Sequence, residues 1–328
     1  MKFVNLTSDA LVLSIVTTGN FEASDISFYN CSATNLLEIV SNSSSLQNMK
    51  VASCSTAFLA NIRATYDIII NRWFSIGLKE ISTMFSFTAN GSISINELQA
   101  IELSAVSSGG ITERSVIFVH TPTLKIQNSS FGDAEGFDVI IDSAAENLVV
   151  CQVLFYGITS SAVISSDGLK TIIEDTTFDT VYTSQTAITL TDSEIILCRL
   201  SVLTFSGVNF VSFPNSKPQL SILLLDSSFH ACTTKASLIY ISHDNVEFSM
   251  FGCTVSNTTV SENSEFSNPP SILSMAGMGE NQYSMKHCSF VDNYCTFFLL
   301  ESIANQYHKS VDGIGDSGRR CFYHQLHI

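Results

Sequence analysis

Apolar and polar positions alternate along this chain in a short phrase that returns many times. Two apolar residues stand two positions apart, two or three small polar residues follow, and a large apolar residue, usually Phe, ends the phrase. Residues 124–131 read LKIQNSSF, and residues 222–229 read ILLLDSSF. Alternation with a period of two is typical of β-strands, so each phrase predicts a strand that leads into a turn and a second strand.

The phrase recurs at a nearly constant interval. Six consecutive copies are spaced by 24, 23, 24, 27 and 26 residues and end at Phe131, Phe155, Phe178, Val202, Phe229 and Val255. A unit of this length cannot bury its apolar face alone and must stack on its neighbours. We therefore expect an all-β, single-domain parallel β-helix of about 11–12 coils, with a period of about 23–27 residues.

Alternation also predicts which side chains face the core. The two leading apolar residues and the terminal Phe should point inward, and so should the small residue two positions before the terminus. That column reads Ser129, Val153, Thr176, Leu200, Ser227, Cys253 and Cys288. The pattern is weaker between residues 46 and 101, where Trp73 beside Phe74 is expected in the core and not as an exposed platform for a sugar.

The repeats also predict the limits of the β-helix. Phe3 lies 25 residues before Phe28, so we expect the helix to cover residues 1–305, to begin within a coil and to be truncated at its N-terminus. Residues 306–328 contain no apolar phrase and predict an irregular tail. Longer spacings before Phe131 and Phe290 predict loops near residues 107–110 and 261–270.

Charge narrows the range of partners. Only 14% of the residues are charged and the formal net charge is −15, so nucleic acid and anionic membrane surfaces would be repelled. No stretch is long and apolar enough to be a transmembrane segment. Six glycosylation sequons favour a cell-surface or extracellular location, and they begin at Asn5, Asn30, Asn42, Asn90, Asn128 and Asn257. Exposed coil ends would be open strand edges, so we also expect self-association.

These repeats resemble the right-handed parallel β-helix repeats of pectate-lyase-like proteins. Within that superfamily they are similar to repeats of polymorphic outer-membrane proteins and protist surface proteins. The likeness covers roughly residues 1–305 and includes the Phe-x-x-Asn signature at Phe290 to Asn293. It implies a right-handed solenoid displayed on a cell surface, with a role in adhesion.

Alignment of the copies places Asp175, Arg199 and Asp226 at the same position in three consecutive coils. Such a column predicts an acid-base-acid ladder that fixes register. The alternative is a catalytic or glycan-binding carboxylate pair, because two acids about 5 to 9.5 Å apart can flank a glycosidic bond. Glu174 and Asp179 complete the densest acidic cluster and are further weak candidates, including for a hard cation.

Nine cysteines show no disulfide or zinc spacing. Cys253 and Cys288 share one inward column, where we expect a reduced, stacked pair more readily than a disulfide. In the tail, Cys321, His324 and His327 are weak candidates for a metal site. No cofactor is predicted.

Three functions stay open at this point. The first is a non-enzymatic surface or secreted β-helix, an adhesin or scaffold that binds glycans or proteins. The second is a polysaccharide hydrolase or lyase with a groove along one sheet. The third is a degenerate fragment without independent activity. Outward columns of Ser, Thr and Asn would favour the first, and an outward carboxylate cluster would favour the second.

Overall fold

The structure of this protein is a computed structural model. It describes residues 1–106, 114–214, 217–261, 271–276, 281–295, 297–301, 309–312 and 315–316. The expected fold class is confirmed, since the described residues form a parallel β-solenoid of about 10 turns without helix. The chain divides into two compact units, residues 1–168 and 169–328, and each is described by itself.

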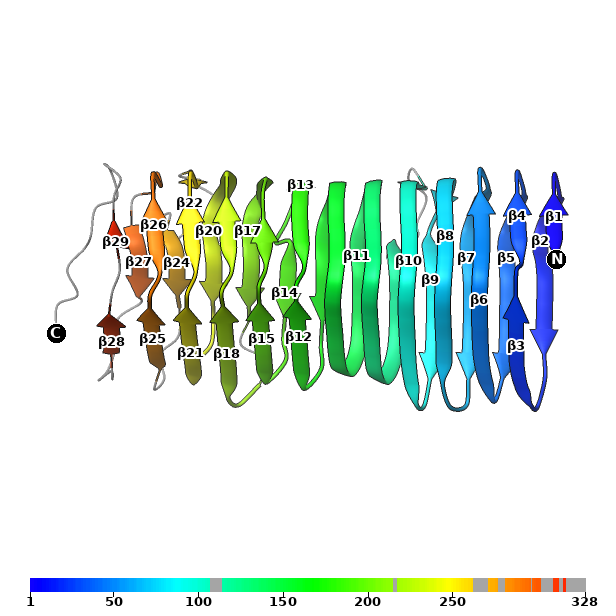
Figure 1. Ribbon diagram of the computed structural model, residues 1–328, viewed down its shortest axis with the longest axis horizontal. Helices are drawn as coiled ribbons and strands as arrows, with labels where there is room; N and C mark the ends of the chain where they lie inside the picture. The colour runs from blue at the N-terminus through cyan, green and yellow to red at the C-terminus, as the bar shows by residue number, and fades with distance from the viewer. Residues whose placement is uncertain are drawn as a thin grey trace. The chain divides into compact units, whose positions relative to one another are not determined.

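Unit 1 is built from the first eleven strands, which stack as successive rungs (Figure 1). Their bounds are β1 Lys2–Val4, β2 Thr7–Val16, β3 Asn20–Ser24, β4 Ser27–Tyr29, β5 Ser32–Ser41, β6 Ser43–Ala52, β7 Ser55–Ala64, β8 Ile68–Ile81, β9 Thr83–Ala89, β10 Ser92–Ala105 and β11 Ser115–Ser166. Every pairing whose register is described is parallel, for example β2 with β5 and β5 with β7. Long strands such as β8 and β10 continue through the first corner of the coil in one register, and their register shifts between Leu103 and Ala105.

The array already includes the first residues of the chain, as the repeat predicts. Phe3 pairs with Phe28 in the β1–β4 ladder, and their rings stack with centroids 4.9 Å apart and planes 9° apart. Phe131 and Phe155 stack in the same way at 5.2 Å. Offset stacking of this kind adds about 0.5–1.5 kcal/mol per pair beyond the burial of the rings.

The weak stretch of the pattern keeps the same register. Val51 pairs with Ser75, and Ser75 pairs with Ala100, so two small residues occupy the column that Phe usually fills. Trp73 compensates for the lost volume, because its buried indole packs edge-on against Phe85 with ring centroids 4.9 Å apart. Its Nε1–H donates to Ser75 Oγ at 2.8 Å, which satisfies the only polar atom of the ring. The core position predicted for Trp73 is confirmed.

Unit 2 contains the remaining strands (Figure 1). Their bounds are β12 Lys170–Glu174, β13 Thr177–Thr183, β14 Ile188–Leu190, β15 Glu194–Cys198, β16 Ser201–Val202, β17 Phe205–Phe213, β18 Leu220–Leu225, β19 Ser228–His230, β20 Cys232–Ile241, β21 Val246–Phe251, β22 Thr254–Ser256, β23 Thr259–Val260, β24 Ser271–Met275, β25 Gln282–Lys286, β26 Ser289–Val291, β27 Phe297–Glu301, β28 Lys309–Asp312 and β29 Gly315–Asp316.

Four parallel ladders run along the described part of unit 2. The first joins β12, β15, β18, β21, β25 and β28, and the second joins β13, β16, β19, β22, β26 and β29. The third joins β14, β17, β20, β24 and β27. The fourth joins β13, β17, β20 and β23. Strands β28 and β29 belong to the segment predicted as a tail, and their backbones extend the first two ladders. The rest of that segment, and most of the two predicted loops, lie outside the described residues.

The core of unit 2 is centred on one aromatic ring. Phe210 is fully buried and packs edge-on against three other rings, with centroid distances of 5.2 Å to Phe178, 5.3 Å to Phe205 and 5.5 Å to Phe229. The expected inward column two positions before the terminus is buried at all seven positions, which confirms the predicted alternation of faces.

Each coil turns its corners through single residues with a left-handed backbone. The first corner column lies three positions before the terminal residue of each phrase, with φ between 44° and 67°, and its members are Asp25, Asn48, Arg72, Glu97, Asn128, Gln152, Asp175, Arg199, Asp226, Gly252 and His287. A non-glycine residue pays about 1–2 kcal/mol for this conformation, and Asn and Asp pay least. The geometry explains why the turns are rich in Asn, Asp and Gly.

The buried residue after each corner holds the turn by a hydrogen bond. Ser129 Oγ donates to the Gln127 carbonyl at 2.7 Å, and Ser227 Oγ donates to the Leu225 carbonyl at 2.7 Å. Cys253 takes the same role, since its thiol donates to the Phe251 carbonyl at 3.4 Å. Cysteine is therefore used here as a small apolar residue with a weak donor.

Candidate functional site

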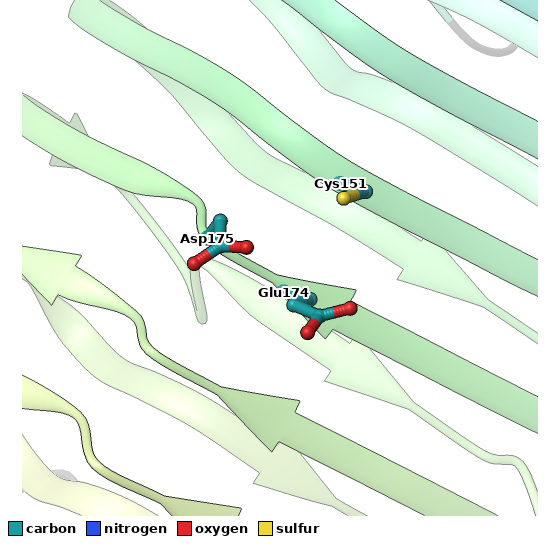
Figure 2. Close-up of side chains that lie close together, drawn as sticks. All are labelled: Cys151, Glu174 and Asp175. Carbon is teal, nitrogen blue, oxygen red and sulfur yellow. The ribbon is translucent and has the colours of Figure 1, made fainter.

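The acidic cluster predicted from the sequence lies at the first corner of unit 2. Glu174 ends β12 and Asp175 follows it in the turn, so their carboxylates come from neighbouring residues, as Figure 2 shows. Arg199 stands one coil further along the same column and binds both. Its Nε donates to Asp175 Oδ1 at 2.6 Å, its Nη2 donates to Asp175 Oδ2 at 2.9 Å, and Nη2 also pairs with Glu174. Cys151, also labelled in Figure 2, belongs to unit 1.

This ion pair decides what the carboxylates can do chemically. The bidentate hydrogen bond from Arg199 lowers the pKa of Asp175, and the same bonds raise the pKa of the guanidinium. A carboxyl held in the ionised form cannot donate a proton near neutral pH, so Asp175 is poorly suited to general acid catalysis. Arg199 Nη1 also lies 3.2 Å from the Cys198 sulfur, so the guanidinium is engaged on several sides.

The other two acidic candidates point elsewhere. Asp226 is exposed on the coil after Arg199, and its Oδ1 would be only 2.3 Å from a Cβ placed on Gly252. Among the described residues no ion pair joins Asp226 to Arg199. Asp179 lies in β13 and accepts a hydrogen bond from the hydroxyl of Thr180 at 3.1 Å. The acid-base contact of the expected ladder is present on one side only, between Arg199 and Asp175.

Hydroxyl side chains dominate the outward column beside these carboxylates. Five residues on successive strands of the second ladder are paired in register, and they are Thr177, Ser201, Ser228, Thr254 and Ser289. Each stands one position before a buried terminal residue, so each faces away from the core. Neighbours in such a column are about 4.8 Å apart. The column is thus a continuous, uncharged row of hydrogen-bond donors and acceptors.

The predicted metal ligands in the tail, Cys321, His324 and His327, lie outside the described residues. The stacked thiol pair is confirmed as reduced, because Cys253 and Cys288 are both buried and free. The hydrogen bond shared with Cys288, together with burial, raises the pKa of Cys253. A thiol that keeps its proton at neutral pH is a poor metal ligand and nucleophile, so Cys253 serves as a core residue.

A groove of about 400 Å³ lies over the first corner column of unit 1, and nothing in the sequence pattern marked it. It is lined by Asp25, Asn48, Met49, Lys50, Arg72, Trp73, Phe74, Glu97, Gln99 and Asn128. These residues come from β6, β8 and β10 and from the corner columns of their neighbours. Exposed Arg72 pairs with Glu97 at 3.0 Å across one coil.

Amide hydrogen bonds continue this groove wall from coil to coil. Asn128 Nδ2 donates to Asn96 Oδ1 at 2.9 Å, and Asn96 Nδ2 donates to Asn71 Oδ1 at 2.9 Å. Near the opposite end, Asn48 Nδ2 donates to Asp25 Oδ1 at 3.3 Å. The polar wall is therefore held in place by its own contacts. A column alignment across residues 46–101 would have found it, but the blurred pattern there hid the register.

Comparison with known proteins adds no relatives. No family model matches the chain, and neither a curated protein nor a solved structure matches it. The fold and the geometry of the described residues therefore carry the functional argument alone.

Proposed function

We propose that this chain is a non-enzymatic surface or secreted β-helix protein, an adhesin or interaction scaffold. The observation that carries the proposal is the outward column of five hydroxyl residues in unit 2. A rigid row of small polar groups at the strand spacing offers hydrogen bonds to a partner without strong charge. Its resemblance to pectate-lyase-like and polymorphic outer-membrane repeats belongs to the same proposal.

The acidic corner supports this function better than a catalytic one. A hydrolase of this type needs two carboxyl groups in different protonation states on either side of a substrate. Here Arg199 pairs with both Asp175 and Glu174, and Asp226 lies against Gly252 instead of facing them. The cluster has the character of a surface ion pair that spans neighbouring coils, which contributes little stability and fixes register.

The partner class follows from the charge. With a formal net charge of −15, the scaffold is expected to bind neutral glycans or basic proteins and to avoid nucleic acid. Glycosylation at the sequons belongs to the same proposal. No described part of the chain forms a helix that would be long and apolar enough to cross a membrane.

Location in intact cells tests the proposal. An antibody against the chain should label unpermeabilised cells or detect the chain in the medium, and external protease should remove the cell-bound signal. Labelling that requires permeabilisation would overturn the proposal. A release of reducing ends or unsaturated products from polysaccharides, abolished by Asp175→Asn or Asp226→Asn, would establish the enzymatic alternative instead.

A further inference from the structure

The groove of unit 1 contains an aromatic ring and long polar side chains at a repeat position where unit 2 has small hydroxyl residues. In the outward column one position before the terminal residue of each phrase, Lys50 pairs in register with Phe74, and Phe74 pairs in register with Gln99. A half-buried aromatic ring therefore stands between two long exposed polar side chains. Neither Lys50 nor Gln99 has a side-chain hydrogen-bond partner among the described residues. The groove thus offers one apolar ring and two free hydrogen-bonding groups on adjacent strands.

We propose that this groove binds a neutral saccharide chain that runs along the coils of unit 1. Sugar rings present apolar C–H faces and hydroxyls that both donate and accept. Phe74 supplies a surface for such a face, Gln99 supplies a donor and an acceptor, and Lys50 supplies donors. The volume of about 400 Å³ lies in the range of small-ligand sites.

The charges of the groove favour an uncharged ligand. Lys50 and Arg72 are matched by Asp25 and Glu97, so the four charged side chains that line the groove sum to zero. Arg72 is already committed to Glu97 at 3.0 Å. An acidic chain would meet one free cation beside two carboxylates on a protein of net charge −15, and repulsion would oppose its binding.

The backbone of the groove argues against an extended peptide as the occupant. Peptides that lie along sheets usually pair with a free strand edge. Strands β6, β8 and β10 are each paired on both sides, so the floor of the groove exposes no edge. A ligand in this groove can therefore be bound only by side chains, which suits a saccharide because its hydroxyls bond to side-chain donors and acceptors.

The floor beneath the groove is rigid. Trp73 and Met49 are buried directly under it, and the hydrogen bond from Trp73 to Ser75 fixes the indole. The amide chain of Asn71, Asn96 and Asn128 holds the neighbouring wall. The floor and this wall therefore need little ordering when a ligand binds, whereas the side chains of Lys50 and Gln99 lose rotamer freedom at that point.

Calorimetry with the full chain tests the inference, which rests on the proposed function and names its ligand class. The probes are short neutral oligosaccharides of glucose, mannose, galactose, xylose and N-acetylglucosamine, with oligogalacturonate as the acidic comparison. At least one neutral series should bind. Phe74→Leu keeps the apolar volume and should weaken that binding about tenfold. Gln99→Ala should weaken it about three- to tenfold.

Matched variants separate binding from folding. Phe74→Tyr keeps the ring and should bind like the parent chain. Glu247→Gln lies at an exposed position of β21 in unit 2, outside both the groove and the hydroxyl column, and should change nothing. Failure of every neutral probe, equal or tighter binding of oligogalacturonate, or unchanged binding by Phe74→Leu would overturn the inference. If the chain is still found at the cell surface in those cases, the proposed function stands and only the saccharide groove is lost.

Discussion

The first corner column has the same backbone in both units but presents two different surfaces. In unit 1 its members Arg72, Glu97 and Asn128 border a groove with a ring and two free polar groups. In unit 2 the members Asp175 and Arg199 bind each other, and small hydroxyls replace the ring and the long side chains beside them. All of these corner residues keep φ near 50–60°.

The difference shows that the fold constrains the backbone of this column more than its side chains. A left-handed φ is required at every coil, and Asn, Asp, Arg, Glu and Gly all meet it here. Outward side chains do not affect the stacking of the core, so they are free to specialise. Function in this solenoid is therefore expected in the side-chain content of outward columns, and not in loops alone.

Core substitutions should give the largest losses in the free energy of unfolding, and they compare the cores of the two units. We expect Trp73→Ala in unit 1 and Phe210→Ala in unit 2 each to lower the free energy of unfolding by about 3–5 kcal/mol, because each empties a packed site. Urea unfolding followed by circular dichroism measures the loss. Phe251→Ala, at a side chain 43% exposed, is the control and should cost little. A loss below about 1 kcal/mol at Phe210 would contradict the described core.

Alkaline pH should destabilise unit 2 in part through the buried thiol of Cys232. Burial raises the pKa of Cys232 from 9.0 to about 12, so the thiol in the unfolded chain loses its proton first. The stabilisation is complete below pH 9 and is lost as pH rises toward 12, by about 1.4 kcal/mol per pH unit.

The variant Cys232→Ala tests this directly in urea titrations at several alkaline pH values. It should be less stable than the parent chain near neutral pH but lose less stability as the pH rises. In unit 1, burial raises the pKa of Cys54 from 9.0 to about 11. Cys54→Ala should therefore reduce the loss of stability over a narrower pH range, between about 9 and 11. Equal alkaline slopes for the parent chain and both variants would contradict the burial of these thiols.

The stability cost of substitutions in the first corner column should depend on the left-handed backbone conformation more than on side-chain charge. Asn128→Val in unit 1 and Arg199→Val in unit 2 place a β-branched residue at φ of 51° and 52°, and each should cost about 1–2 kcal/mol. Asn128→Gly and Arg199→Gly should cost much less, because glycine adopts this conformation freely. Thermal unfolding of the four variants measures this. Both Arg199 variants lose the ion pair, so a larger cost for Arg199→Gly than for Arg199→Val would contradict the argument from backbone shape.

Acid sensitivity should be small and stronger in unit 1. The hydrogen bonds from Arg114 at 2.9 and 3.2 Å lower the pKa of Asp138. Because the folded pKa is the lower one, this stabilisation is present above about pH 4 and is lost as pH falls through the folded pKa. Asp138→Asn should remove about 1 kcal/mol at neutral pH and flatten the acid limb of the stability curve.

The matched variant Asp175→Asn in unit 2 breaks a more exposed pair and should change stability less. Both variants are compared with the parent chain by urea unfolding at neutral and acidic pH. Parallel acid limbs for Asp138→Asn and the parent chain would contradict the assignment.

Much of the fold follows from particular residues of the sequence. The terminal Phe of each phrase and its spacing predict stacked coils, and Phe3 pairs with Phe28 as expected. Less of the candidate site could be predicted from the sequence. The repeat predicts that Asp175 and Arg199 are neighbours, and the 2.6 Å contact between Arg199 Nε and Asp175 Oδ1 confirms this. Their contact with Glu174, and the way Asp226 lies against Gly252, depend on rotamers that no column alignment specifies. The sequence pattern does not distinguish Phe74 from its buried neighbour Trp73, although the two side chains point to opposite faces of β8.

The sequence by itself determined the period, the strand alternation and the inward column, because a repeat with period-two strands has only one face to bury. In the blurred stretch between residues 46 and 101, only the tertiary structure decided which outward residues meet. Lys50, Phe74 and Gln99 are about a coil apart in sequence, and they become neighbours through the register of β6, β8 and β10. Register across coils depends on the left-handed corners and on core packing, and neither is visible in a local pattern of apolar and polar positions.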